Sequence, residues 1–98
     1  MAGAAIMVLT QMPDRASALA LAQALVEARL AACVSIGAPV ESLYHWRGKT
    51  ETAQEVPVAV KTRPGRYADV EAAIRARHPF ELPEIVAVPI IDGLAPYL

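Results

Sequence analysis

Residues Ala31–Thr62, AACVSIGAPVESLYHWRGKTETAQEVPVAVKT, carry the strongest structural signal in the chain. Aromatic residues and threonines surround the tetrapeptide Arg47-Gly48-Lys49-Thr50, and such residues favour β-strands. Gly48 suits the first central position of a tight turn, because glycine adopts positive φ at little cost. The segment therefore predicts one long β-hairpin whose tip lies at residues 47–50.

The hydrophobic pattern of the two strands requires a change of register. A turn centred on Gly48-Lys49 places Ile36 opposite Lys61. A half-buried sheet instead needs Ile36 on the same face as the valines of residues 56–60, and a one-residue slip turns every side chain to the other face. We therefore expect a bulge or bend at Gly37-Ala38-Pro39.

This bent hairpin has two consequences for function. Its tip, where Trp46 is predicted to face Glu51, projects beyond the body of the domain and cannot bury its aromatic residues alone. Cys33 and Lys61 are expected to share the face of the sheet that lacks the core valines.

Two further strands and two helices complete the chain. Residues 4–10 and 85–91 are apolar at both alternating positions, which indicates strands buried on both faces. Helices are predicted from Asp14 to Leu30 and from Pro64 to Arg77 or His78, with a proline-stiffened crossing over residues 78–84. We expect the buried stripe of the first helix to be widened by Leu19 and Val26, and Arg77 to lie on the inner face of the second.

The order βαββαβ predicts an α+β, ferredoxin-like fold, in which an antiparallel sheet carries two helices on one face. The second face, with strands that are apolar on both sides, needs a cover of its own. No segment of a single domain over residues 1–98 is left to provide that cover, so we expect it to be another copy of the chain.

Composition and charge narrow the class of protein. Of the 98 residues 55% are hydrophobic, and nine basic residues stand against ten acidic ones. This balance argues against a nucleic-acid or membrane-surface binder that works by electrostatics. The chain has no apolar run near the 18 or so residues of a membrane span, and residues 4–12 indicate a strand and no signal peptide. A single cysteine forbids an internal disulfide, so we expect a cytoplasmic protein.

Several motifs, in order along nearly the whole chain, resemble the CutA divalent-cation-tolerance family. They are Leu30-Ala31-Ala32-Cys33-Val34, Leu43-Tyr44-His45-Trp46-Arg47-Gly48-Lys49, Glu55-Val56, Val60-Lys61-Thr62, His78-Pro79-Phe80-Glu81, Pro83-Glu84-Ile85, Gly93 and Tyr97-Leu98.

The resemblance implies a ferredoxin-like homotrimer with interlocking hairpins and with its sheets facing inward. It also implies tolerance and binding of divalent metal ions, copper above all. Ser35 and Phe80 replace the more common Asn and Tyr, and Pro57 stands inside the third strand. Relatives often continue beyond the position of Leu98, so we expect the cleft between subunits to be less completely closed here.

Cys33 and His78 are the candidate metal ligands. A thiolate suits soft metal ions such as Cu(I), and imidazole suits copper and zinc. The alternatives are a packed, inert thiol at Cys33 and a helix-ending hydrogen bond at His78. His45 is interpreted as a solvated or interface residue. The chain has no motif for a dedicated metal site, so any ion must be held by distant residues or between subunits.

A second interpretation is a cleft that binds a small ligand. Lys61 on an apolar face needs a charged partner or a wet cleft. The resemblance places Trp46, Glu55, Lys61, His78, Glu84 and Tyr97 at positions associated with a cleft between subunits. The alternative is an interface salt bridge of Lys61 with Glu55 or Glu84.

Basic residues before the second helix suggest an anion site. Arg63 and Arg66 follow Lys61 and surround a helix N-terminus, where a phosphate-bearing effector could bind; ordinary solvated charges are the alternative. The chain contains no phosphate loop, nucleophile elbow or acid–base pair, so we do not expect an enzyme. Two functions remain open: a metal-binding tolerance protein, or a trimeric signalling or scaffold module that binds a small anionic effector in the cleft between subunits.

Overall fold

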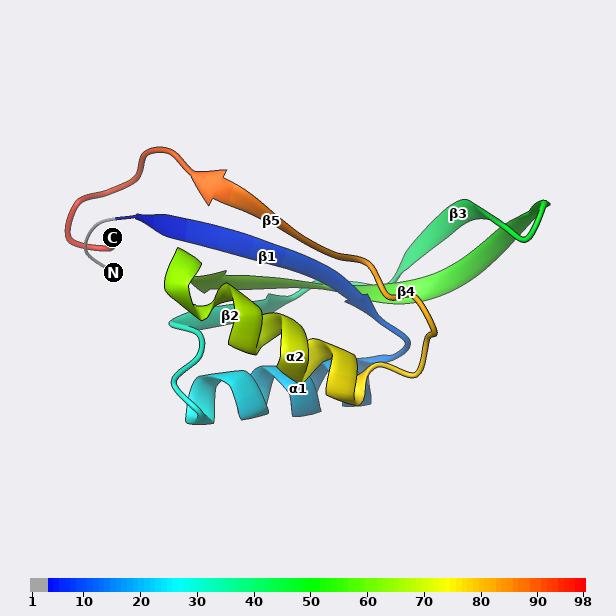
Figure 1. The fold of residues 1–98 in the computed structure, drawn as a ribbon, viewed down its shortest axis with the longest axis horizontal. Coiled ribbons are helices and arrows are strands. Elements are labelled where there is room, and N and C mark those ends of the chain that lie inside the picture. The colour runs from blue at the N-terminus through cyan, green and yellow to red at the C-terminus, as the bar shows by residue number, and fades with distance from the viewer. Residues whose placement is uncertain (1–3) are drawn as a thin grey trace.

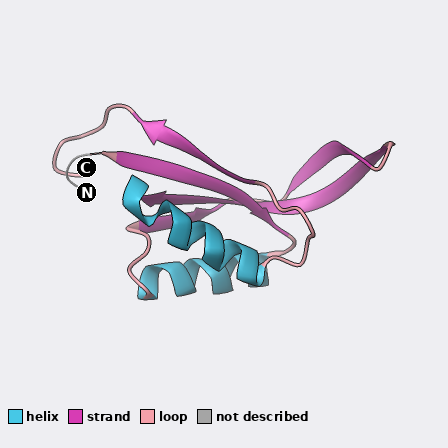
Figure 2. Ribbon diagram, viewed as in Figure 1, coloured by secondary structure: helices cyan, strands magenta, loops and turns pink. Residues whose placement is uncertain are grey.

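An antiparallel sheet with strand order β2-β4-β1-β5 organises the chain, and both helices lie on one of its faces (Figures 1 and 2). The structure is a computed structural model that describes residues 4–98. The strand β3 pairs only with the outer half of β4. The elements are β1 (Ala5–Met12), α1 (Arg15–Glu27), β2 (Cys33–Ile36), β3 (Val40–Trp46), β4 (Lys49–Thr62), the 3₁₀ turn η1 (Pro64–Arg66), α2 (Tyr67–Arg77) and β5 (Ile85–Ile90). The predicted α+β, ferredoxin-like fold is confirmed.

The predicted change of register occurs at residues 37–39. Ile36 of β2 pairs with Val58, whereas Val40 of β3 pairs with Glu55, so three residues on one strand stand opposite two on the other. Pro57 lies opposite this bulge, where its missing N–H interrupts no ladder bond. A Cβ on Gly37 would approach Pro57 Cγ to 2.8 Å, so only glycine fits against the proline ring.

The tip of the hairpin differs from its prediction by one position. Arg47 and Gly48 are the two central residues of the turn, with φ of 52° and 79°, and Trp46 pairs with Lys49. The prediction of a turn centred on Gly48-Lys49, with Trp46 opposite Glu51, is therefore wrong. Two-residue hairpin turns of this kind need positive φ at both central residues, and Arg47 adopts it although it has a side chain. The tip projects well beyond the sheet (Figure 1).

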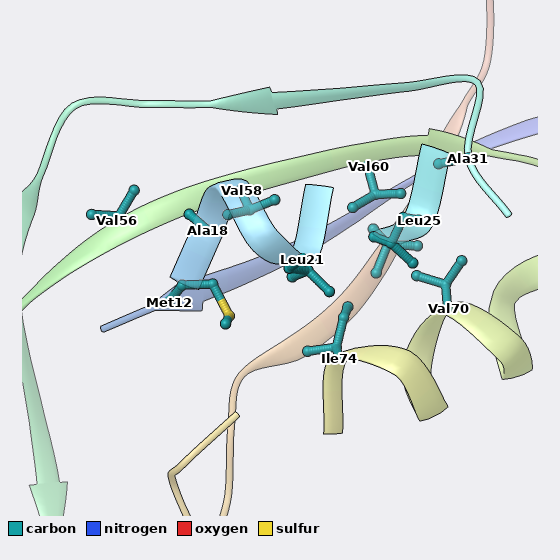
Figure 3. Packing of buried hydrophobic residues seen from close by; sticks show 11 residues of the cluster. Met12, Ala18, Leu21, Leu25, Ala31, Val56, Val58, Val60, Val70 and Ile74 are labelled. Carbon is teal, nitrogen blue, oxygen red and sulfur yellow. The ribbon is translucent and has the colours of Figure 1, made fainter. Parts of the chain in front are cut away.

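The core lies between the helices and one face of the sheet (Figure 3). Val8 on β1 pairs with Val60 on β4, and both are fully buried. Leu21 and Leu25 of α1 pack against these valines, together with Val70 and Ile74 of α2. The alternating valines of β4 therefore face the helices, and Cys33 and Lys61, which are cross-strand partners, share the opposite face as predicted.

The first helix begins and ends at local signals. The Asp14 side chain accepts a hydrogen bond from the Ser17 N–H at 2.7 Å, and this bond lowers the pKa of Asp14. The helix ends at Glu27 and not at Leu30, because Arg29 turns the chain with a positive φ of 59°. Among residues 4–98, neither helix is long and apolar enough to span a membrane.

Three side chains predicted to face the core do not. Leu19 and Val26 remain about half exposed, and Arg77 is exposed. Because α1 rests on the sheet through the single stripe of Ala18, Leu21 and Leu25, its neighbouring residues face away from the sheet.

The second face of the sheet carries no helix (Figure 2). Val86 and Val88 of β5 point to this open face and are 47% and 38% exposed. Leu9 of β1 and Ala59 of β4, which pair with each other, lie on the same face. The described chain thus leaves a core-like surface without a cover of its own.

Candidate functional site

A pocket of about 810 Å³ lies between the base of the projecting hairpin and the crossing that joins α2 to β5. Tyr44 and Trp46 of β3, with Phe80 of the crossing, provide its aromatic walls. Glu55 of β4, with Glu81 and Glu84 of the crossing, provides its carboxylates. The volume is in the range that small-molecule sites occupy.

Strand alternation and proline stiffening bring these residues together. The side chains of Tyr44, Trp46 and Glu55 all point to the same side of the hairpin, because Tyr44 and Trp46 pair with Glu51 and Lys49 and residues two apart share a face. The crossing carries Pro79 and Pro83 and runs past the base of the hairpin (Figure 1). Two segments that are distant in sequence therefore face each other across the pocket.

One ion pair joins the tip of the hairpin to the crossing. Arg47 Nη2 lies 3.2 Å from Glu81 Oε2, and the Arg47 guanidinium stands 5.4 Å from the centre of the Trp46 ring. Both charged side chains are about three-quarters exposed, so this pair contributes little to stability. Its geometry does show that a cation fits between the Trp46 ring and a carboxylate.

Glu55 is the exceptional residue of the pocket. It is only 8% exposed, and no hydrogen bond or ion pair to it occurs among residues 4–98. Buried carboxylates are ordinarily paired, because removing a charge from water is costly. Glu55 therefore places in the pocket wall a carboxyl group that has no partner among residues 4–98.

His78 holds the near end of the crossing in place. The Phe80 N–H donates to His78 Nδ1 at 3.2 Å, so the proton of the neutral ring lies on Nε2, which donates to the Gln11 carbonyl at 2.6 Å. The ring also contacts Phe80, with 4.7 Å between centroids, and His78 is buried. Both ring nitrogens are engaged, so a metal ion would have to displace one of these bonds.

Lys61 and Tyr97 meet at the other end of the open face. Lys61 Nζ donates to the Tyr97 hydroxyl at 3.5 Å and lies 5.6 Å from the ring centroid. Cys33, a free and half-buried thiol, is the cross-strand partner of Lys61. Lys61 and Glu55 lie six positions apart on β4, roughly 20 Å at about 3.3 Å per position. Within one chain, the residues predicted to share a cleft thus form two groups.

The two predicted metal ligands are also separate in one chain. Cys33 and Met7 both pair with Lys61, so Cys33 lies level with the start of β1. His78 instead bonds to the Gln11 carbonyl at the far end of β1. Within residues 4–98 no group of three or more His, Cys, Asp or Glu side chains could hold a metal ion.

The remaining candidates lie on the surface. Arg63 immediately precedes η1 and Arg66 ends it, both exposed, and His45 is exposed in the hairpin. Lys61 contacts Tyr97, and the structure records no contact between it and the two arginines. Phe80 and Glu81 line the pocket but were not predicted as site residues. The prolines around them were the available signal, since a stiff crossing fixes the side chains that it carries.

Comparison with known proteins decides the family. Residues 6–98 match the family model described as CutA1 divalent ion tolerance protein. The chain belongs to this family. The divalent-cation tolerance protein CutA of Thermus thermophilus is 42% identical over 91 residues, which cover 93% of this chain and 88% of that protein. The CutA homolog of Xenopus laevis is 38% identical over 88% of this chain, which spans 57% of that longer protein.

Solved structures of CutA1 proteins share the fold. The crystal structure of CutA1 from the psychrotrophic bacterium Shewanella sp. SIB1 superposes with a TM-score of 0.92. It is 43% identical in sequence, and the match covers 95% of this chain and 87% of that one. The resemblance inferred from the motifs at 30–34, 43–49 and 78–85 is therefore confirmed.

Proposed function

We propose that this CutA1-family chain is a cytoplasmic homotrimer, without enzymatic activity, that binds a divalent metal ion, copper above all, and contributes to metal tolerance. The observation that supports it is the family match over residues 6–98, together with relatives named for divalent-cation tolerance. The free Cys33 thiol fits a reducing compartment such as the cytoplasm.

The open face of the sheet supports the trimer. Val86 and Val88 are as apolar as the core valines but remain exposed in a single chain. Burying apolar surface releases roughly 25 cal/mol for each Å², so copies of the chain gain free energy when they close over this face. In a closed ring of three copies, the open face of each chain would be covered by a neighbouring copy.

One chain cannot form a metal site by itself, because its described residues contain no cluster of three or more potential metal ligands. A shared site fits better, since Cys33 lies on the open face that the trimer would close. Three thiolates around a three-fold axis would form a soft site that prefers copper. His78 would join only by giving up the bond to Phe80 or to Gln11.

Titration with Cu(I) and Cu(II) tests the metal site. We expect saturable binding with fewer ions than chains, which Cys33→Ala abolishes. Ser35→Ala, on the same strand and face, is the matched control and should bind as the wild type does. His78→Ala reports whether the imidazole joins the site. Unchanged binding by Cys33→Ala would remove the thiol from the site and contradict this part of the proposal.

A further inference from the structure

The outer part of the hairpin, residues 40–54, forms an arm that stands clear of the body of its own chain (Figure 1). Ser42 and Ala53 are half-buried, and every other residue of the arm is exposed. Among the described strands, β3 pairs only with β4. A two-stranded hairpin is marginally stable in water by itself. The direction of the arm must therefore be set where the arm joins the sheet.

The arm joins the sheet at the bulge of residues 37–39, opposite Pro57 of β4. The Gly37 N–H donates a hydrogen bond to the Pro57 carbonyl at 2.9 Å. Pro57 also pairs with Gln11 of β1, so it belongs to the body of the sheet. Proline is tolerated in a central strand only at a bulge of this kind. The contact between Gly37 and Pro57 therefore links the base of the arm to the body.

Gly37 and Pro57 fit each other closely. A Cβ on residue 37 would lie 2.8 Å from Pro57 Cγ, and a proline ring cannot swing away as a flexible side chain can. The other two atoms near that position lie at 3.7 and 3.8 Å, which is ordinary contact. The φ of Gly37 is outside the left-handed region. The proline ring, and not the backbone conformation, is therefore what restricts position 37 to glycine.

Two prolines limit the movement of this junction. Pro57 fixes its own φ, and Pro39 does the same on the other strand while it keeps Ala38 extended. The N–H and C=O of one strand residue point to the same neighbouring strand, so the nitrogen of Pro57 faces the bulge, as its carbonyl does. This nitrogen carries no hydrogen and cannot draw a bulge residue into a continuous ladder. The bulge, and with it the direction of the arm, is fixed.

A fixed direction matters when a second copy receives the arm. A single chain leaves Tyr44 and Trp46 of the arm 42% and 37% exposed. Ordering a mobile segment on association costs free energy, and a segment that is already stiff avoids this cost. We propose that Gly37 and Pro57 form a stiff joint that holds the arm in the direction in which a neighbouring copy binds it. This inference rests on the homotrimer proposed above and names the residues that prepare each chain for it.

Hydrogen–deuterium exchange of the full chain, followed by mass spectrometry, tests the joint through a double-mutant comparison. Gly37→Ala should raise the exchange rate of the arm amides by about tenfold or more, because the new Cβ meets the proline ring. Pro57→Ala should raise it by about two- to fivefold, since it removes stiffness without a clash. In the double variant the Cβ has no ring to meet, so its arm should exchange as that of Pro57→Ala does.

Two controls separate the joint from a general loss of stability. In every variant the amides of β1 should change less than those of the arm, which a uniform loss of stability would not produce. Gly65→Ala, whose new Cβ meets open space, should leave exchange of the arm unchanged. Circular dichroism of each variant checks that the fold is retained.

Light scattering along a guanidinium titration follows the assembly in the same variants. Gly37→Ala should lose the mass of three chains at a lower denaturant concentration than the wild type. The double variant should lose it at the same concentration as Pro57→Ala.

The outcomes separate the joint from the assembly. A Gly37→Ala effect of equal size with and without Pro57 would overturn the joint, because the ring would then not be the obstacle. Faster arm exchange in a trimer as resistant as the wild type would overturn the role in assembly. A wild-type mass of one chain would refute the homotrimer and this role with it, whereas the exchange comparison would still decide whether the joint exists.

Discussion

The two faces of one sheet differ in what covers them. On the helix face, Val58 and Val60 of β4 are at most 1% exposed, because α1 and α2 lie over them. On the open face, Val86 and Val88 of β5 are 47% and 38% exposed. The side chains are of the same kind, so the difference arises from the number of helices and not from the sequence of the strands. Apolar alternation shows that a face is to be covered, without showing which molecule covers it.

The largest expected effect comes from the helix face. Leu21→Ala should lower the free energy of unfolding by about 2–5 kcal/mol, because it leaves a cavity at a fully buried position. Leu19→Ala, on the same helix but half exposed, is the matched control and should cost about 1 kcal/mol or less. Urea denaturation followed by circular dichroism measures both. Equal losses would show that the outer side of α1 is covered as well.

The next effect concerns the link between the core and the pocket. His78→Ala should destabilise the protein by about 1–3 kcal/mol, because the Gln11 carbonyl and the Phe80 N–H both lose their partner. The crossing would also become less ordered, which Trp46 fluorescence can detect. The exposed His45 provides the control, since His45→Ala should change stability by no more than about 0.5 kcal/mol. A His78 variant as stable as the His45 variant would refute the structural role.

A smaller effect is expected at the tip of the hairpin. Gly48→Ala places a side chain at a φ of 79° and should cost about 1–2 kcal/mol. Gly65→Ala, where φ is not in the left-handed region and the new Cβ meets open space, should be nearly neutral. Differential scanning calorimetry of the pair separates backbone strain from side-chain contact. A neutral Gly48 variant would mean that the turn shifts by one residue without cost.

The smallest effect is the pH dependence of the α1 cap. The hydrogen bond from the Ser17 backbone N–H lowers the pKa of Asp14 in the folded chain. Its stabilising contribution is therefore present above the pKa of the unfolded chain and is lost as pH falls through the lower folded value. Asp14→Asn, a neutral cap, should lose less stability than the wild type across this acid range. Parallel acid titrations of both proteins, followed by circular dichroism, would contradict the prediction if the curves had the same slope.

Part of the fold could be predicted from the sequence. The valines at 56, 58 and 60 required a change of register, and Gly37-Ala38-Pro39 was the available place for it, as the structure confirms. The centre of the turn could not be predicted, because it depends on Arg47 adopting positive φ, for which an arginine gives no local signal.

The candidate site was predictable only in part. Trp46, Glu55 and Glu84 were expected at a cleft between subunits, and within one chain they line one pocket. Lys61 and Tyr97 were expected at the same cleft and within one chain meet each other at the other end of the face, so the cleft between subunits stays a prediction. Strand alternation shows which face a residue lies on, and it does not show which residues of a neighbouring copy it would meet. The burial of Glu55 depends on the path of the crossing, which residues 78–84 do not specify by pattern.

Light scattering on the purified protein, at dilute concentration, tests the central claim that copies of the chain cover the open face. We predict a mass three times that of the 10.4 kDa chain, and a lighter species for Val88→Asp, which places a charge on that face. A stable species with the mass of one chain would contradict the claim, and the open face would then be an exposed surface.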